Sequence, residues 1–216
     1  MVYETEQEQI EAIKRWWSEN GKFVIAGLVI GLGSVIGWRW WQGHIASQAA
    51  AASAQHSQML DAIQADNNGK AEGIGKTLIN DYASTPYAAQ AAVDLAGQEV
   101  ELGHLDQAVG HLSWAMAHGD DAALRLVARL RLAQVLLAQD KPEAALQKLG
   151  QAEAGKFQPL YDEARGDAYV ALKQYDKASK AYAAALDGLE PGMGDRNLLQ
   201  MKIDNLPGTA VADSGK

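Results

Sequence analysis

The feature that most constrains this chain is an uncharged apolar run from Phe23 to Trp38, bounded by Lys22 and Arg39. As a helix this run spans roughly 24 Å, and it approaches the roughly 30 Å of a bilayer core if the flanking charges extend toward water. Tryptophan pairs, which favour the headgroup regions, lie on both sides at Trp16, Trp17, Trp40 and Trp41. The sequence therefore predicts a single transmembrane helix over residues 23–41.

Two other interpretations of the apolar run are less favoured. A cleavable signal peptide would use Ala52-Ser53-Ala54 as its cleavage site, but that site lies far beyond the run. The preceding residues 4–19 are also acidic and helix-forming, unlike the start of a signal peptide. A buried helix of a soluble domain would need apolar surroundings that the rest of the chain does not offer.

The predicted membrane helix contains two G-x-x-x-G pairs, Gly27 with Gly31 and Gly33 with Gly37. Such pairs let two helices approach closely in lipid, so they are candidate packing sites for another membrane helix. The alternative is that they are ordinary glycines, which are common in any membrane helix.

Basic residues near the run predict its orientation. Lys14, Arg15 and Lys22 precede it, whereas after Arg39 no Lys or Arg occurs before Lys70. Because basic residues are retained on the cytoplasmic side, we expect a single-pass type II protein of a bacterial inner membrane, with its N-terminus cytoplasmic and its C-terminal domain periplasmic. The chain has no cysteine, so this domain folds without disulfides.

The composition beyond the run predicts an all-α fold. Alanine, leucine, glutamine and glutamate recur at helical spacing, and only five prolines interrupt them. The formal net charge of −8 makes nucleic acid an unsuitable partner.

An internal repeat of 33 to 37 residues predicts how these helices are arranged. In the clearest unit, from Pro159 to Gly192, small residues and tyrosines alternate at spacings that resemble the tetratricopeptide repeat. Two earlier units repeat the pattern, and Pro142 and Gly103 lie in the turns between their helices. We therefore expect a tetratricopeptide-like helical-repeat solenoid. The expected division is a cytoplasmic amphipathic arm (1–22), the transmembrane helix (23–41), a linking helix with a degenerate first repeat (42–88), three repeats (89–192), a C-terminal capping helix (193–206) and a disordered tail (207–216).

A solenoid of this type presents the first helix of each repeat on a concave surface that binds extended or helical ligands. In register with the repeat, the candidate partner-binding residues are Val93, Val100, Val127, Leu130, Gln134, Leu137 and Val170. Most are apolar, so an apolar segment is a better ligand than an acidic C-terminus. Alternatively, some of these side chains belong to the core between repeats.

The sequence contains no recognisable catalytic, cofactor-binding or metal-binding motif. His104, His111 and His118 recur every seven residues, but on the expected helices they are too far apart to share an ion, which favours solvent-facing or helix-terminal histidines. Arg125, Arg129 and Arg131 are interpreted as a solvated or salt-bridged face. We therefore expect a protein-binding function without a cofactor, and no enzyme.

Both ends of the chain carry distinctive motifs. They are Tyr3-Glu4, the segment Glu8 to Trp17, Glu19-Asn20-Gly21-Lys22, Gly37-Trp38-Arg39-Trp40-Trp41 and the late segment Met201 to Leu206. Together with the glycine-rich run, they resemble the YfgM family of Gram-negative inner-membrane proteins over nearly the whole chain. The resemblance implies an ancillary subunit of the SecYEG translocon that pairs with the membrane-anchored chaperone PpiD and passes exported client proteins to periplasmic chaperones. It also implies a second role, the restraint of an RcsB-type stress-response regulator.

The cytoplasmic arm offers a surface for that second role. Ile10, Ile13 and Trp17 fall at i, i+3 and i+7 and form an apolar stripe on one helix face. The stripe is expected either to contact the regulator or to lie on the membrane surface, and the tryptophans favour the membrane. The main expectation is thus a translocon-associated scaffold, and the alternative is a negative regulator that acts through this arm.

Overall fold

The structure is a computed structural model that describes residues 2–150, 153–192 and 194–207. It comprises two compact units, Met1–Gln48 and Ala49–Lys216. The helices are α1 (Val2–Gln64), α2 (Asn68–Asp81), α3 (Pro86–Glu101), α4 (Leu105–His118), α5 (Ala122–Ala138), α6 (Pro142–Leu149), α7 (Gln158–Ala171), α8 (Tyr175–Gly188) and α9 (Arg196–Asp204), with a 3-10 turn η1 (Gly155–Phe157) before α7. No strand occurs among the described residues, so the expected all-α fold is confirmed there. Of the predicted tail, only Pro207 lies within the described residues.

The first unit consists of the N-terminal part of α1. This is the one helix among the described residues that is long and apolar enough to cross a membrane, judged by length and composition. Its large apolar side chains are exposed from Ile10 to Ile45, as lipid-facing side chains would be. The predicted membrane segment is therefore helical, without a break in the backbone hydrogen bonding that lipid requires.

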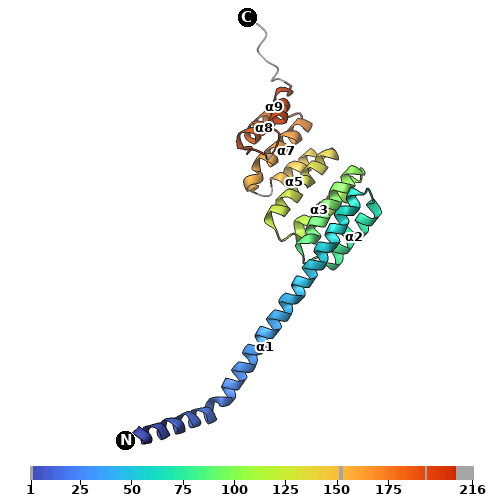
Figure 1. Ribbon diagram of the computed structural model, residues 1–216. Helices are drawn as coiled ribbons and strands as arrows, with labels where there is room; N and C mark the ends of the chain where they lie inside the picture. The colour runs from blue at the N-terminus through green and yellow to red at the C-terminus, as the bar shows by residue number, and fades with distance from the viewer. Residues whose placement is uncertain (1, 151–152, 193, 208–216) are drawn as a thin grey trace. The chain divides into compact units, whose positions relative to one another are not determined.

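The second unit is built from helical hairpins (Figure 1). The two helices of each hairpin are joined by the same kind of turn. In the α3–α4 turn, Gly103 has a left-handed φ of 78°, its N–H donates to Val100 O at 3.0 Å, and the N–H of His104 donates to Glu99 O at 2.7 Å. Such bonds satisfy the last carbonyls of a helix. The turns at Asp66, Asp140 and Lys173 have the same pattern and a positive φ of 53°, 58° and 59°.

These four turn residues lie 37, 37 and 33 residues apart along the chain. The end of α1 and α2 therefore form a hairpin equivalent to α3–α4, α5–α6 and α7–α8. Each helix from α2 to α9 packs on the next one in sequence, and α3, α5 and α7 also make contacts across the intervening helices. The expected degenerate repeat before residue 89 thus has the turn geometry of the later repeats.

Small residues let neighbouring helices approach closely, both within a hairpin and between hairpins. A methyl group on Gly166 of α7 would overlap the ring of Tyr182 on α8, and one on Gly75 of α2 would lie 2.6 Å from Leu95 Cδ1 on α3. Buried Ala96 of α3 and Ala133 of α5 occupy the places that correspond to Gly166 in the earlier hairpins. Much of the core is therefore filled by closely spaced helices with small side chains between them, and not by bulky side chains.

Helix α9 closes the C-terminal end of the unit. The carboxylate of Asp195 caps it by accepting from the N–H groups of Asn197 at 2.9 Å and Leu198 at 3.2 Å. Its buried Leu199, and Leu206 beyond it, belong to a cluster with Ala178, Tyr182 and Ala185 of α8.

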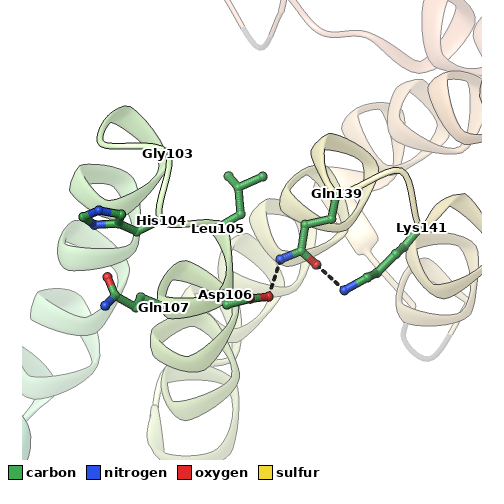
Figure 2. Close-up of a pocket in the computed structure, with 7 residues that line it drawn as sticks. All are labelled: Gly103, His104, Leu105, Asp106, Gln107, Gln139 and Lys141. Carbon is green, nitrogen blue, oxygen red and sulfur yellow. Dashed lines mark hydrogen bonds between the residues drawn. The ribbon is translucent and has the colours of Figure 1, made fainter.

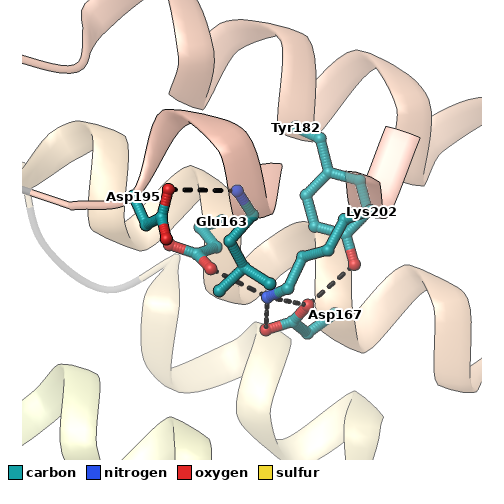
Figure 3. A network of polar contacts seen from close by, with 6 residues as sticks. Glu163, Asp167, Tyr182, Asp195 and Lys202 are labelled. Carbon is teal, nitrogen blue, oxygen red and sulfur yellow. Dashed lines mark hydrogen bonds and ion pairs between the residues drawn. The ribbon is translucent and has the colours of Figure 1, made fainter. Parts of the chain in front are cut away.

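A polar network fixes α9 to α7 (Figure 3). Lys202 Nζ donates to Glu163 Oε1 at 2.8 Å and to Asp167 Oδ1 at 2.8 Å, and Tyr182 OH donates to Asp167 Oδ1 at 2.7 Å. Burial alone would lower the pKa of Lys202, but its hydrogen bonds to Asp167 and Glu163 outweigh burial and raise that pKa. The pKa of Tyr182 is raised by burial and by its bond to Asp167. Lys202 is therefore charged and Tyr182 neutral throughout the physiological range.

Replacement of Lys202 should loosen the C-terminal end of the unit. Lys202→Met keeps the apolar stem but leaves Glu163 and Asp167 without their cation, so we expect the free energy of unfolding to fall by roughly 2 kcal/mol. Urea denaturation of the full chain in detergent, followed by circular dichroism, would measure the change. Lys180→Met, at an exposed position on α8, is the matched control and should leave stability nearly unchanged. Equal stability of the two variants would contradict a structural role for the network.

Candidate functional site

A mostly apolar cleft of about 480 Å³ lies between α3 and α5 and contains two of the predicted partner-binding residues, Val100 and Gln134. Buried parts of α3, α4 and α5 form its floor. Its lining residues are Ala96, Gly97, Val100, Glu101, Leu112, Arg131, Gln134, Val135 and Ala138. Val100 is 40 % exposed, which makes it one of the few large apolar side chains of the second unit that is open to solvent. Because monomer surfaces rarely leave apolar groups open in a concave site, this cleft is the candidate binding site.

The rim of the cleft carries polar side chains without partners. Glu101, Arg131 and Gln134 are exposed, and none of these three side chains makes a hydrogen bond or an ion pair within the described residues. Their acceptors and donors are therefore available to a ligand. Arg131, expected only as part of a solvated or salt-bridged face, lines the cleft and has no carboxylate partner.

A second, shallower cleft of about 250 Å³ lies at the other end of α3. Leu60, Val93 and Leu124 give it an apolar surface, and His56 and Asp94 lie at its edge. His56 Nε2 lies 2.8 Å from Asp94 Oδ2, so this polar pair, unlike the rim of the first cleft, is already satisfied within the chain.

The other predicted partner-binding residues are less accessible. Leu130 and Val93 are only 8 % and 5 % exposed and belong to the main core cluster, which Leu137 also contacts. Val127 and Val170 are partly buried. For Leu130 and Val93, the alternative of core packing describes the structure better than an open surface.

The corresponding face of α7 is partly covered. Lys202 of α9 binds Glu163 and Asp167, which follow Leu130 and Gln134 by 33 residues in the repeat. The open part of the predicted surface is therefore confined to α3 and α5. The sequence analysis missed this restriction of the open surface, because helical periodicity does not show which helix Lys202, near the C-terminus, contacts.

Another crevice, of about 520 Å³, lies between the α3–α4 and α5–α6 turns (Figure 2). Most of its side chains are polar, and three of them bond to one another: Gln139 Nε2 donates to Asp106 Oδ1 at 2.9 Å, and Lys141 Nζ donates to Gln139 Oε1 at 2.8 Å. A ligand here would have to replace these bonds, so this crevice is a weaker candidate than the apolar cleft.

The three histidines spaced seven residues apart have separate environments. His104 Nδ1 lies 2.7 Å from Glu99 Oε2, whereas the His118 ring stacks on Trp114 with centroids 4.4 Å apart. His111 is partly buried on α4. Within the described residues, no group of three or more His, Cys, Asp or Glu side chains is placed to hold a metal ion.

The predicted sites of the first unit lie on exposed helix surfaces. In the arm, Ile10, Ile13 and Trp17 are 52 %, 67 % and 52 % exposed. A methyl group at any of the candidate packing glycines would meet nothing within 4 Å. Those glycines are Gly27, Gly31, Gly33 and Gly37. Both surfaces are thus largely open within the described part of the first unit, and their roles remain predictions.

Paired helices joined by one recurring turn and packed closely at small residues define a helical-repeat protein. In agreement, residues 14–208 match the family model described as a tetratricopeptide repeat-like domain. The chain is similar to proteins named ancillary SecYEG translocon subunit from Escherichia coli (32 % identity, 95 % of this chain and 98 % of the relative) and Neisseria gonorrhoeae (33 %, 93 % and 97 %). A protein of the same name from Haemophilus influenzae is 31 % identical over 95 % of this chain and its own full length. The chain therefore belongs to the family of these relatives, the YfgM family that its terminal motifs resemble. No solved structure matches it.

Acidification should destabilise the second unit through His111. Burial lowers the pKa of His111, with Glu99 opposing and Lys76 adding to the effect. The unfolded chain therefore binds the proton at a higher pH than the folded chain, and stability should fall as the pH is lowered from about 7.5 to about 5.5. His111→Gln should reduce this dependence, measured as urea midpoints across the range. An NMR titration midpoint for His111 above about 6.5 would contradict the argument.

Proposed function

We propose that this protein is a scaffold of the bacterial inner membrane, associated with the SecYEG translocon, that binds other proteins through the α3–α5 cleft. The single observation that carries the proposal is this exposed apolar cleft, in a chain whose relatives are named translocon subunits. The proteins bound are exported clients or the chaperone PpiD, and the scaffold helps transfer the clients to periplasmic chaperones. Binding without catalysis is the activity proposed.

The proposed arrangement in the membrane rests on charge and on packing. Basic residues precede the apolar run, which favours a cytoplasmic N-terminus and therefore a periplasmic location of the cleft. The contacts between successive helices, together with those from α3 to α5 and from α5 to α7, are those expected of a solenoid. In that arrangement α3, α5 and α7 lie on the concave face.

Photo-crosslinking tests the scaffold function. A photoreactive amino acid at Val100, in the full chain in its membrane, should give adducts with translocon subunits, PpiD or exported chains, because this side chain is exposed in the cleft. Ser113, exposed on α4, is the matched control position and should give few such adducts. Val100→Asp, combined with a photoreactive residue at Gln134, should lower the adduct yield severalfold because it places a charge on apolar surface. Equal yields at Val100 and Ser113 would contradict the proposal.

A second candidate function is negative regulation of an RcsB-type stress response through the cytoplasmic arm. The observation that favours it is the exposed stripe of Ile10, Ile13 and Trp17. The same stripe would also suit the membrane surface. Ile13→Asp should relieve repression in a reporter assay if the stripe binds the regulator, with Glu11→Asp as control. Unchanged reporter activity in Ile13→Asp would leave the membrane surface as the role of the arm.

A further inference from the structure

Gly97 occupies an unusual place in the α3–α5 cleft. It lies inside α3, where glycine destabilises a helix relative to alanine, and its φ is not left-handed. A methyl group at this position would meet no atom within 4 Å. Unlike Gly75 and Gly166, Gly97 is therefore not required by the packing of the fold or by the backbone conformation. Besides its cost to helix stability, the missing side chain leaves the backbone of α3 uncovered where it borders the cleft.

A bare helix backbone in a cleft allows another main chain to approach closely. On the facing helix α5, Arg131 and Gln134 present unpaired donors, and the Gln134 amide also offers an acceptor. Glu101, at the end of α3, offers a carboxylate without a partner. An extended polypeptide has free N–H and C=O groups that match this set, whereas a helix satisfies most of its own. The apolar floor, formed by Ala96, Leu112 and Val135, would take one of the ligand's apolar side chains.

We propose that the α3–α5 cleft binds polypeptide in an extended conformation, with the ligand main chain crossing α3 at Gly97 and hydrogen-bonding to Arg131 and Gln134. This inference rests on the proposed function and names its ligand: an unfolded segment with an aliphatic side chain, bound largely through its main chain. Such recognition tolerates many sequences, because every residue of an extended chain offers the same backbone groups.

The experiment measures binding and stability together in the full chain, in nanodiscs of phosphatidylethanolamine and phosphatidylglycerol. The probe is a fluorescein-labelled, acetylated and amidated nine-residue peptide of Gly and Ser with a central Val-Leu pair, followed by anisotropy. Gly97→Ala should weaken its binding by about fivefold or more, since the added methyl group occupies the path of the main chain. The same substitution should raise the melting temperature by roughly 1 to 4 °C, since alanine favours the helix.

Gly110→Ala is the matched control. Gly110 is a helical glycine of α4, exposed, with no atom within 4 Å of an added methyl group, but it lies outside the cleft. It should raise the melting temperature by a similar amount and leave peptide binding unchanged. Arg131→Met with Gln134→Leu should weaken binding about tenfold, through the loss of hydrogen bonds to the ligand.

Two modified probes separate an extended ligand from a helical one. The peptide N-methylated on both sides of the Val-Leu pair should bind weakly, and a hydrocarbon-stapled helix with the same two residues should bind more weakly than the linear peptide. Wild-type affinity in Gly97→Ala, or tighter binding of the stapled helix than of the linear peptide, would overturn the proposal that the ligand is extended. The proposed scaffold function would still stand in that case if Val100 crosslinks to the expected partners. If the linear peptide does not bind while Val100 crosslinks to exported chains, the proposed ligand conformation is likewise wrong. If a photoreactive residue at Val100 of the otherwise wild-type chain gives no such crosslinks, the proposed function itself is wrong.

Discussion

The second unit depends on close approach between neighbouring helices at small residues. Where Gly75 of α2 meets Leu95 of α3, and where Gly166 of α7 meets Tyr182 of α8, there is no room for a further carbon atom. Contact between a glycine backbone and the facing side chain therefore sets the spacing of these helix pairs. The recurring turn at Asp66, Gly103, Asp140 and Lys173 makes the same connection each time. Each hairpin thus contacts mainly its neighbours, and most of the structure follows from repetition of one short-range arrangement.

The same repetition explains why a cleft opens where it does. The small residues that face the partner helix of a hairpin are buried, but Gly97 and Val100 lie on the side of α3 that faces α5 across the cleft. Two repeats later, a polar network occupies the equivalent side of α7, because Lys202 of α9 binds Glu163 and Asp167. The end helix that protects the apolar C-terminal core therefore also limits the open surface to α3 and α5.

Local spacing determined how much could be predicted from the sequence. The apolar membrane run and the helical hairpins each depend on residues close in the chain, and the structure forms both as helices. The candidate site was predicted only in part. Val100 and Gln134 line the cleft, but Leu130 is buried, because helical periodicity gives the face of a residue and not the angle at which the next helix crosses it. The pairing of Lys202 with α7 depends on that same tertiary geometry.

A cleft of this size gains little affinity from apolar burial alone, because Val100 and the small residues around it offer modest area. In the proposed setting that weakness is useful. A protein held in the membrane beside an emerging chain meets it at a high effective concentration, so a weak site is occupied often and also releases its ligand quickly. Recognition through the main chain adds to this effect, since successive segments of one unfolded chain can rebind at the same cleft. Tight and sequence-specific binding would instead oppose the passage of a client to the next chaperone.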